Sequence, residues 1–433
     1  VTKVKDGHTV ENTATQVTND KRDKTNTVSN PLKEINPKKD VTVKVGGDSV
    51  DGRSVYLDST FLYQLDSSIL PADRAYQKIA NWGITDQLDP AYDKATGQWA
   101  VYAARDLYRG GEAIAKKGER IAGSGFDSSR LGGDMFTANI DPSTGLVDIQ
   151  ATQAYLDLVS ADDAHEQGWR AYVQVTRVKV TDRHENVFTE HVNGKDLTSN
   201  IVWTRTPDLT PGIKLEKWDR RSGWPKGDRD DSKDALDGAK DGDVIVFTIT
   251  NTSKDEDGHG AWFKASDLKL EDHTIVGDGE VKDLKYPDNW STLVLKPGQS
   301  VEVTGTLTGF TKDRHTDRAK VTGTPLVECP VVDKDPFGDA SGKPSTGGEA
   351  GDGDGPRQVT VGDRTLCEDT PVESNTDDWN GRRSLLGETG SAILPLGVGA
   401  LLMAGLGAAV VMVRRRKSAH DDKDAALMPR HAA

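Results

Sequence analysis

Short segments that alternate apolar and polar residues, or that are rich in β-branched residues, dominate the middle of the chain. Gly, Pro, Asn and Asp separate these segments, which is typical of strands joined by turns. The clearest are TFLYQL (60–65), QWAVYAARDLY (98–108), WRAYVQVTRVKV (169–180), DVIVFTITN (243–251), STLVLKPGQS (291–300) and VEVTGTLTGF (301–310). Helical patterns cover only PADRAYQKIANW (71–82) and TQAYLDLVS (152–160). This pattern predicts a mainly β protein made of antiparallel, Ig-like β-sandwich domains in series.

Two distant segments, residues 11–28 and 185–202, share a pattern. Each opens with Glu-Asn and places two further asparagines at the same intervals, and each is followed by a proline. The second copy ends a unit that starts near INPKKDVTVKV (35–45), and the offset between the copies is a plausible length for one domain. We therefore expect residues 1–31 to be the last strands of a truncated upstream domain. Residues 32–207 then form one complete β-sandwich and residues 208–331 a second, Ig-like one.

The C-terminal part of the chain has a different composition. Residues 332–385 are rich in Gly, Asp and Pro and poor in large apolar side chains, which predicts a flexible linker. Residues 391–413 carry no charge and are followed by three arginines and a lysine. As a helix this run would be about 34 Å long, enough to cross a bilayer. The basic cluster predicts a cytoplasmic tail over residues 418–433 and an external location for everything before the span.

Composition excludes several classes of function. The formal net charge is −14, and no basic stripe is present that would bind nucleic acid. No pair of histidines has metal-binding spacing, and no nucleophile elbow or phosphate-binding loop occurs, so the sequence offers no enzyme active site. The two cysteines, Cys329 and Cys367, lie outside the best-patterned region and cannot hold the main fold together. Outside the membrane, an oxidising setting allows a disulfide between them.

The pentapeptide before the apolar run is Leu386-Gly387-Glu388-Thr389-Gly390. It resembles the LPxTG-type sorting signals of Gram-positive surface proteins, with glycine in place of the usual proline. The resemblance implies a sorting signal over residues 386–417, in which a sortase cleaves between Thr389 and Gly390 and joins the threonine to peptidoglycan. A permanent single-pass membrane anchor is the alternative.

Several segments between residues 30 and 207 occur in the order found in the C-terminal domains of streptococcal antigen I/II adhesins. They are INPKKDVTVKV, ILPADRAYQKIANWGITDQLD, YDKATGQWAVYA, YVQVTRVKV, ENVFTEHVNG and SNIVWTRTP. The region is also similar to the enterococcal aggregation substances. This resemblance implies the β-sandwich stalk of an elongated adhesin on the cell surface, whose domains form spontaneous Lys–Asn isopeptide bonds with help from an acidic residue.

Carried onto this sequence, the resemblance implies a bond between Lys39 and Asn186, with Asp86 as the assisting acid. Lys38 and Asp89 are the neighbouring alternatives. A lysine amine is a nucleophile only when it is neutral, and burial lowers its pKa. Burial raises the pKa of a carboxyl group, which then stays protonated and polarises the asparagine carbonyl by a hydrogen bond. Attack by the amine expels ammonia.

Residues 208–330 resemble the Ig-like repeats of bacterial surface proteins through IKLEKWDRRSGWPKGDRDD, VIVFTITNTS, YPDNWSTLVLKPGQSVEVTGTL and HTDRAKVTGTP. Some such repeats are also crosslinked. Lys217 and Asp317 occupy the terminal strands of this unit, but the usual asparagine is absent. The pair is a second candidate crosslink, and an ordinary sandwich is the alternative.

These observations predict a wall-anchored adhesin stalk that presents an N-terminal ligand-binding region to host glycoproteins, matrix or partner cells. Its other partners would be a sortase, peptidoglycan and, through the C-terminal helix, the membrane. A conjugation-type aggregation protein and a structural spacer or pilus-like scaffold are the alternatives. No cofactor is required. The resemblance implies that calcium can bind in these domains, but the acidic loops at 227–238 and 253–260 lack EF-hand spacing, so the metal ligands are unknown.

Overall fold

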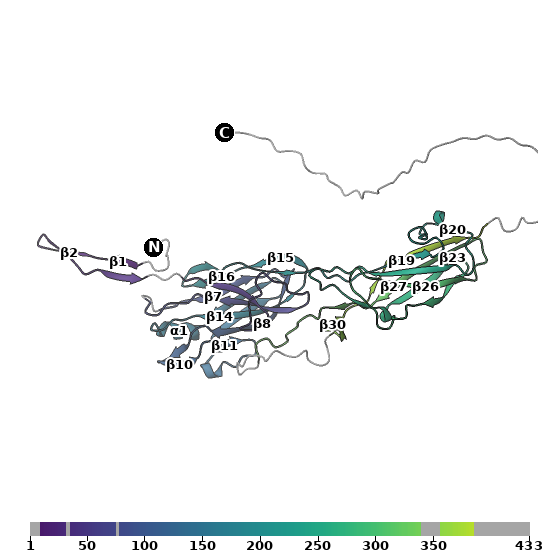
Figure 1. Ribbon diagram of the computed structural model, residues 1–433. Helices are drawn as coiled ribbons and strands as arrows, with labels where there is room; N and C mark the ends of the chain where they lie inside the picture. Colours follow the sequence, from purple (N-terminus) through teal and green to yellow (C-terminus); the bar gives the residue numbers. More distant parts are fainter. Residues whose placement is uncertain (1–8, 32–34, 75–77, 339–355, 385–433) are drawn as a thin grey trace, which may run out of the picture. The chain divides into compact units, whose positions relative to one another are not determined.

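The computed structural model describes residues 9–31, 35–74, 78–338 and 356–384. Within these ranges the chain is mainly β and almost entirely antiparallel, with a single α-helix, α1 (Gln153–Ala161), as the alternating pattern predicts (Figure 1). Two separate hydrophobic cores lie in two β-sandwiches.

Two five-stranded sheets form the first sandwich. One has the order β11 (Arg120–Gly123), β8 (Asp93–Ala103), β14 (Trp169–Arg177), β6 (Thr60–Asp66) and β5 (Lys38–Thr42). The other has the order β12 (Phe136–Asp141), β13 (Leu146–Ala151), β7 (Trp82–Gln87), β16 (Phe188–Val192) and β17 (Lys195–Thr198). Apolar side chains of both sheets, such as Phe61, Val173 and Ile149, are buried in one core because alternate residues of each strand face inward. Two further pairs are β15 (Thr181–Asn186) with β18 (Val202–Thr206) and β9 (Leu107–Arg109) with β10 (Glu112–Ala115).

Of the two predicted helices, only the one at residues 152–160 is present, as α1. The helix predicted over residues 71–82 is wrong, because its described residues are not helical and β7 begins at Trp82. Arg74 in this segment is buried, and its guanidinium donates to the carbonyl oxygens of Val159 and Asp162 at the end of α1. Tertiary contacts to unsatisfied helix carbonyls therefore override the local helical pattern.

A second sandwich begins with β19 (Ile213–Asp219). Its first sheet has the order β19, β21 (Val244–Asn251), β26 (Ser300–Thr308) and β24 (Glu280–Lys285). The facing sheet has the order β20 (Leu236–Asp237), β32 (Asp377–Arg382), β27 (Arg314–Gly323) and β23 (Lys269–Gly277), and β31 (Val372–Glu373) also pairs with β27. Smaller sheets are formed by β22 (Phe263–Lys264) with β25 (Val294–Leu295), and by β28 (Leu326–Val327), β30 (Arg364–Glu368) and β29 (Gln358–Val361).

The predicted flexible linker over residues 332–385 is wrong for residues 356–384, which contain four strands, and the second sandwich does not end at residue 331. Strand β32 lies between β20 and β27 and pairs with β27 from Asp377 to Arg382. The Trp379 side chain is fully buried in the second core. The Sγ atoms of Cys329 and Cys367 are bonded, which ties the residues after β28 to β30.

Residues 331–338, at the start of the same predicted linker, are also ordered against the first sandwich. The backbone N–H of Thr60 donates to the carbonyl of Val331 at 2.8 Å, and Arg120 donates to the carbonyl of Phe337 at 3.2 Å. The Phe337 ring is buried in a small cluster with Leu62 and Tyr172. These hydrogen bonds and the buried ring of Phe337 together hold a segment whose composition is otherwise typical of a linker.

The N-terminal segment forms two strand pairs, β1 (Thr9–Asn12) with β4 (Val28–Pro31) and β2 (Thr15–Thr18) with β3 (Lys21–Lys24), and the side chains of residues 9–30 are exposed. Its turn repeats that of the second copy, because Asn19 and Asn193 have φ angles of 45° and 47°. The sorting motif and the predicted span 391–413 lie outside the described residues. Among the residues that are described, no helix is long and apolar enough to cross a membrane.

Candidate crosslink site

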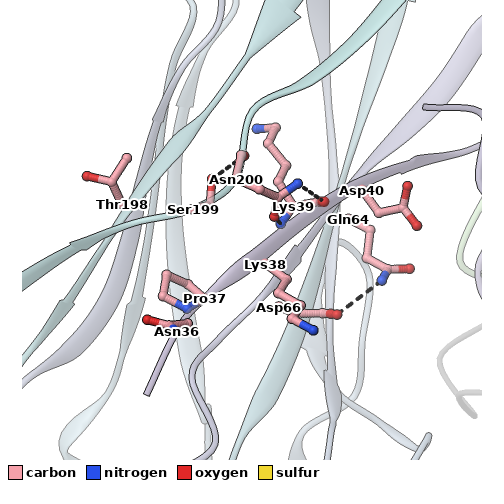
Figure 2. A pocket seen from close by; sticks show the side chains of 10 residues that line it. All are labelled: Asn36, Pro37, Lys38, Lys39, Asp40, Gln64, Asp66, Thr198, Ser199 and Asn200. Carbon is pink, nitrogen blue, oxygen red and sulfur yellow. Dashed lines mark hydrogen bonds between the residues drawn. The ribbon is translucent and has the colours of Figure 1, made fainter. Parts of the chain in front are cut away.

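Lys39 lies on the edge strand β5, and the alternation of this strand turns its side chain inward while that of Lys38 is exposed. Asn200 holds the backbone of Lys39 from the loop after β17 (Figure 2). The Lys39 N–H donates to Asn200 Oδ1 at 2.9 Å, and Asn200 Nδ2 donates to the Lys39 carbonyl at 3.0 Å. The asparagine side chain thus satisfies two backbone groups that an edge strand would otherwise leave to water.

The amino group of Lys39 is enclosed by Asp86 and two aromatic rings. Its Nζ contacts the carboxylate of Asp86 on β7 and lies 4.5 Å from the ring centroid of Tyr63 and 5.6 Å from that of Phe188. Both side chains of the ion pair are at most 1% exposed. Burial lowers the pKa of Lys39 and raises that of Asp86, although each partner opposes the shift of the other. Both shifts favour an uncharged amine beside a protonated acid.

Asn186 is the last residue of β15, and its side chain belongs to the same site. Phe188 pairs across from Asp86, which brings Asn186, two residues earlier, close to the carboxyl group. The side chain is 7% exposed, and its Oδ1 accepts the N–H of Val187 at 2.7 Å. Neither Asn186 Nδ2 nor Asp86 Oδ1 has a hydrogen bond of ordinary geometry among the described residues. An interaction with the Asn186 side chain is one of the causes that lower the pKa of Asp86 against burial, so the amide lies against this carboxyl group.

The structure brings together Lys39, Asp86 and Asn186 and leaves both alternatives outside. Lys38 is exposed, and Asp89 is exposed at a turn where its carboxylate accepts the N–H of Ala91 at 3.0 Å. Lys39 and Lys38 thus differ in which side of β5 they occupy, whereas Asp86 lies within β7 and Asp89 lies beyond its end.

A second buried ionic group next to the site was missed by the sequence reasoning. The carboxylate of Asp93 accepts from Arg177 Nε at 2.6 Å and from the Tyr63 hydroxyl at 2.6 Å, and His184 Nε2 lies 3.3 Å away. Both Asp93 and Arg177 are completely buried. The signal was present, because Arg177 falls on the inward face of an alternating strand, where a charged residue requires a partner.

In the second sandwich, oxygen atoms of Glu216, Asp228 and Asp377 lie within 4.8 Å of one another. Burial raises the pKa of Asp377 to about 8 and that of Asp228 to about 6. The neighbouring Asp230 is the second cause of both shifts. The folded protein therefore holds protons here that the unfolded chain has already released at neutral pH.

Because the pKa of Asp377 is higher in the folded than in the unfolded chain, stability is greatest below pH 4 for this group and is lost as the pH rises to about 8. We expect the melting temperature to fall over this range, and Asp230→Asn to flatten the fall by removing the like charge beside Asp377. Thermal unfolding at several pH values measures this fall, with Asp234→Asn, a change at an exposed aspartate, as control.

Calcium prefers carboxylate oxygens, so an ion bound by these three acids would raise Tm more at pH 8 than at pH 5. An equal rise of Tm at both pH values would exclude calcium binding at this cluster.

Comparison with known proteins agrees with this architecture. Residues 36–207 match the family described as cell surface antigen C-terminus, and residues 1–32 match the cell surface antigen I/II C2 terminal domain. The aggregation substance of Enterococcus faecalis is 35% identical over 204 residues, which cover 46% of this chain and 14% of that protein. The chain thus spans only a small part of the length of this curated relative.

Among solved structures, the C-terminal domain of the antigen I/II-family protein AspA of Streptococcus pyogenes is 26% identical. The match covers 46% of this chain and 55% of that one with a TM-score of 0.40. The corresponding domain of BspA from Streptococcus agalactiae is 21% identical over 46% of this chain and 59% of that one, also with a TM-score of 0.40.

Residues 1–32 and 36–207 are therefore similar to the C-terminal domains of antigen I/II-type cell surface proteins.

Proposed function

We propose that this chain is the load-bearing stalk of a wall-anchored adhesin, in which an amide bond between Lys39 and Asn186 closes the first sandwich. The observation that carries the proposal is the meeting of the Lys39 amine, the Asp86 carboxyl group and the Asn186 amide in one dry interior. Wall attachment through Thr389, sortase and peptidoglycan as partners, and presentation of a ligand-binding region to host or partner cells belong to the same proposal.

The described contacts support each step of the bond. Proton transfer from the Lys39 ammonium to Asp86 leaves a neutral amine, which attacks Cγ of Asn186. The Val187 N–H already bonded to Oδ1 stabilises the negative oxygen of the tetrahedral intermediate. Asp86, which interacts with the Asn186 side chain, then gives its proton to the departing nitrogen, which leaves as ammonia, and takes up the extra proton of the Lys39 nitrogen as the amide forms. No cofactor takes part.

The bond would give the stalk resistance to pulling force. Lys39 lies on the first strand of the sandwich and Asn186 near the last, so force entering at one end passes through a covalent link to the other. The strands between these two residues form the core but would not transmit the pulling force. An adhesin that holds a cell under flow requires this property.

Intact mass spectrometry of the purified, thiol-reduced chain tests the bond. We expect a mass deficit of one ammonia that peptide mapping places at Lys39 and Asn186, and Asp86→Asn to remove this deficit because general acid–base help of this kind is worth about 10²–10⁴-fold in rate. Asp89→Asn, three residues further on, should retain the ammonia loss. If the Lys39 and Asn186 peptides of the wild-type chain are separate and have their full sequence mass, the proposal is refuted.

Adhesin and spacer are separated by a binding experiment. The chain is immobilised and exposed to host matrix glycoproteins and to partner cells. Binding to the stalk itself would identify it as an adhesive surface, whereas a stalk that binds neither would have only a presenting or spacing role.

A further inference from the structure

The second sandwich buries a lysine against two carboxyl groups. Lys217 on β19 is completely buried, and its Nζ lies 2.5 Å from Oδ1 of Asp272 and 2.6 Å from Oδ1 of Asp317. The two aspartates come from β23 and β27 of the facing sheet. The side chain of Asp317 is 1% exposed and that of Asp272 is 9% exposed. The amine thus crosses the core to meet two acids, whereas Lys39 in the first sandwich contacts one acid, Asp86.

Both carboxyl groups lie within hydrogen-bonding distance of the amine, so the amine can give a proton to one acid and form a bond to the carboxyl carbon of the other. Asp317 is the more deeply buried of the two, whereas Asp272 lies on the edge strand β23 and is slightly exposed. Asp317 is therefore the acceptor that is better shielded from water, and Asp272 is the proton carrier.

The remaining neighbours exclude water from the amine and hold the Asp317 carboxyl group in place. The ring of Phe247 lies 5.2 Å from Nζ and helps to exclude water. His315 donates through Nδ1 to the carbonyl of Asp278 at 2.7 Å, and its Nε2 lies 3.2 Å from Oδ2 of Asp317. Burial raises the pKa of Asp272 to about 6, against the opposing charge of Lys217. Lys217 and His315 outweigh burial at Asp317 and lower its pKa.

In both sandwiches, an asparagine side chain holds the backbone of the strand that bears the lysine. Asn375 accepts the N–H of Leu215 at 2.9 Å and donates to its carbonyl at 3.0 Å, as Asn200 does for Lys39. A serine precedes each asparagine and donates to the asparagine carbonyl, and a strand begins two residues later in both cases. This similarity of the two sandwiches is independent of the carboxyl groups, and it includes β32, which lies within the predicted linker.

We propose that Lys217 forms an amide bond with Asp317, assisted by Asp272, and that one water is released. This bond uses none of the residues of the Lys39–Asn186 site and lies outside residues 36–207. Either bond can therefore be absent while the other is present.

The reaction balances without a co-reactant. The ammonium of Lys217 gives a proton to Asp272, and the neutral amine attacks Cγ of Asp317. The C–N bond forms as one C–O bond of Asp317 breaks, and Asp272 relays protons from the nitrogen to the departing oxygen, which leaves as water. One cation and one carboxylate are thereby replaced by a neutral amide, which removes two buried charges from the core.

The test is peptide mapping of the thiol-reduced, unfolded wild-type chain by high-resolution mass spectrometry. We expect a branched peptide that joins Lys217 to Asp317 and is one water lighter than its two parts. An ammonia deficit at Lys39 and a water deficit at Lys217 are separate signals. A linear, unmodified Lys217 peptide, or a branch from Lys217 to Asp272, would overturn the proposal.

Asp317→Asn provides a sharper variant, because it preserves the shape of the acceptor and changes only the leaving group. The variant should lose ammonia in place of water and yield a branched peptide identical to that of the wild type. Asp272→Asn should leave both peptides linear, and the exposed Lys214→Arg on the same strand should retain the branch. Formation of the branch in Asp272→Asn at the wild-type rate would contradict the assisting role.

Discussion

Lys39→Ala is expected to abolish the ammonia deficit of the chain and to lower the free energy of unfolding by roughly 5 kcal/mol. The estimate takes the bond as a disulfide-like crosslink, for which closing a loop of more than about 100 residues removes this much conformational free energy from the unfolded state. Burial raises the pKa of Asp86, which reduces the cost of leaving this side chain without its lysine partner. Urea unfolding together with intact mass measures both effects.

Two comparisons make this result specific. Lys39→Met fills most of the space of the lysine stem and separates loss of packing from loss of the bond. Lys38→Ala changes the exposed neighbour and should leave mass and stability as in the wild type. Equal stability of Lys39→Met and wild type would show that no covalent bond closes this sandwich.

Arg177→Met is expected to destabilise the first sandwich by about 3–5 kcal/mol, because it leaves the buried carboxylate of Asp93 without its cation. The remaining partners, the Tyr63 hydroxyl and His184, do not replace the lost charge in full. The charge of Asp93 also acts on the Lys39 and Asp86 pair, raising the pKa of both. Urea unfolding measures the loss of stability, and the mass shows whether the crosslink still forms.

Arg183→Met is the matched control, since Arg183 pairs with Glu185 at 2.7 Å on the surface, where both side chains are about half exposed. Such pairs are worth about 1 kcal/mol or less. Addition of Asp93→Asn to Arg177→Met should recover part of the stability by removing the unpaired charge. A double variant less stable than Arg177→Met would show that Asp93 has a role other than balancing the arginine.

The candidate site shows which of its residues can be identified from the sequence and which cannot. Alternation along β5 identifies Lys39 as the inward lysine once the strand is known, and the resemblance supplies Asn186 and Asp86. The same alternation along β14 places Arg177 inside, but the sequence gives no partner for it. Asp93 is its neighbour only because β14 and β8 pair in one register, with Arg177 opposite Asp93.

By itself, the sequence determined the mainly β architecture, the first sandwich and the inward face of each long strand, because period-two alternation is a local property that survives in any strand pairing. Only the tertiary structure decided where residues 356–384 belong. Their composition predicts a linker, since few large apolar residues occur there. Yet Trp379 completes a core whose other members lie far away in the sequence. Burial of that kind depends on contacts between distant segments, and no local pattern records it.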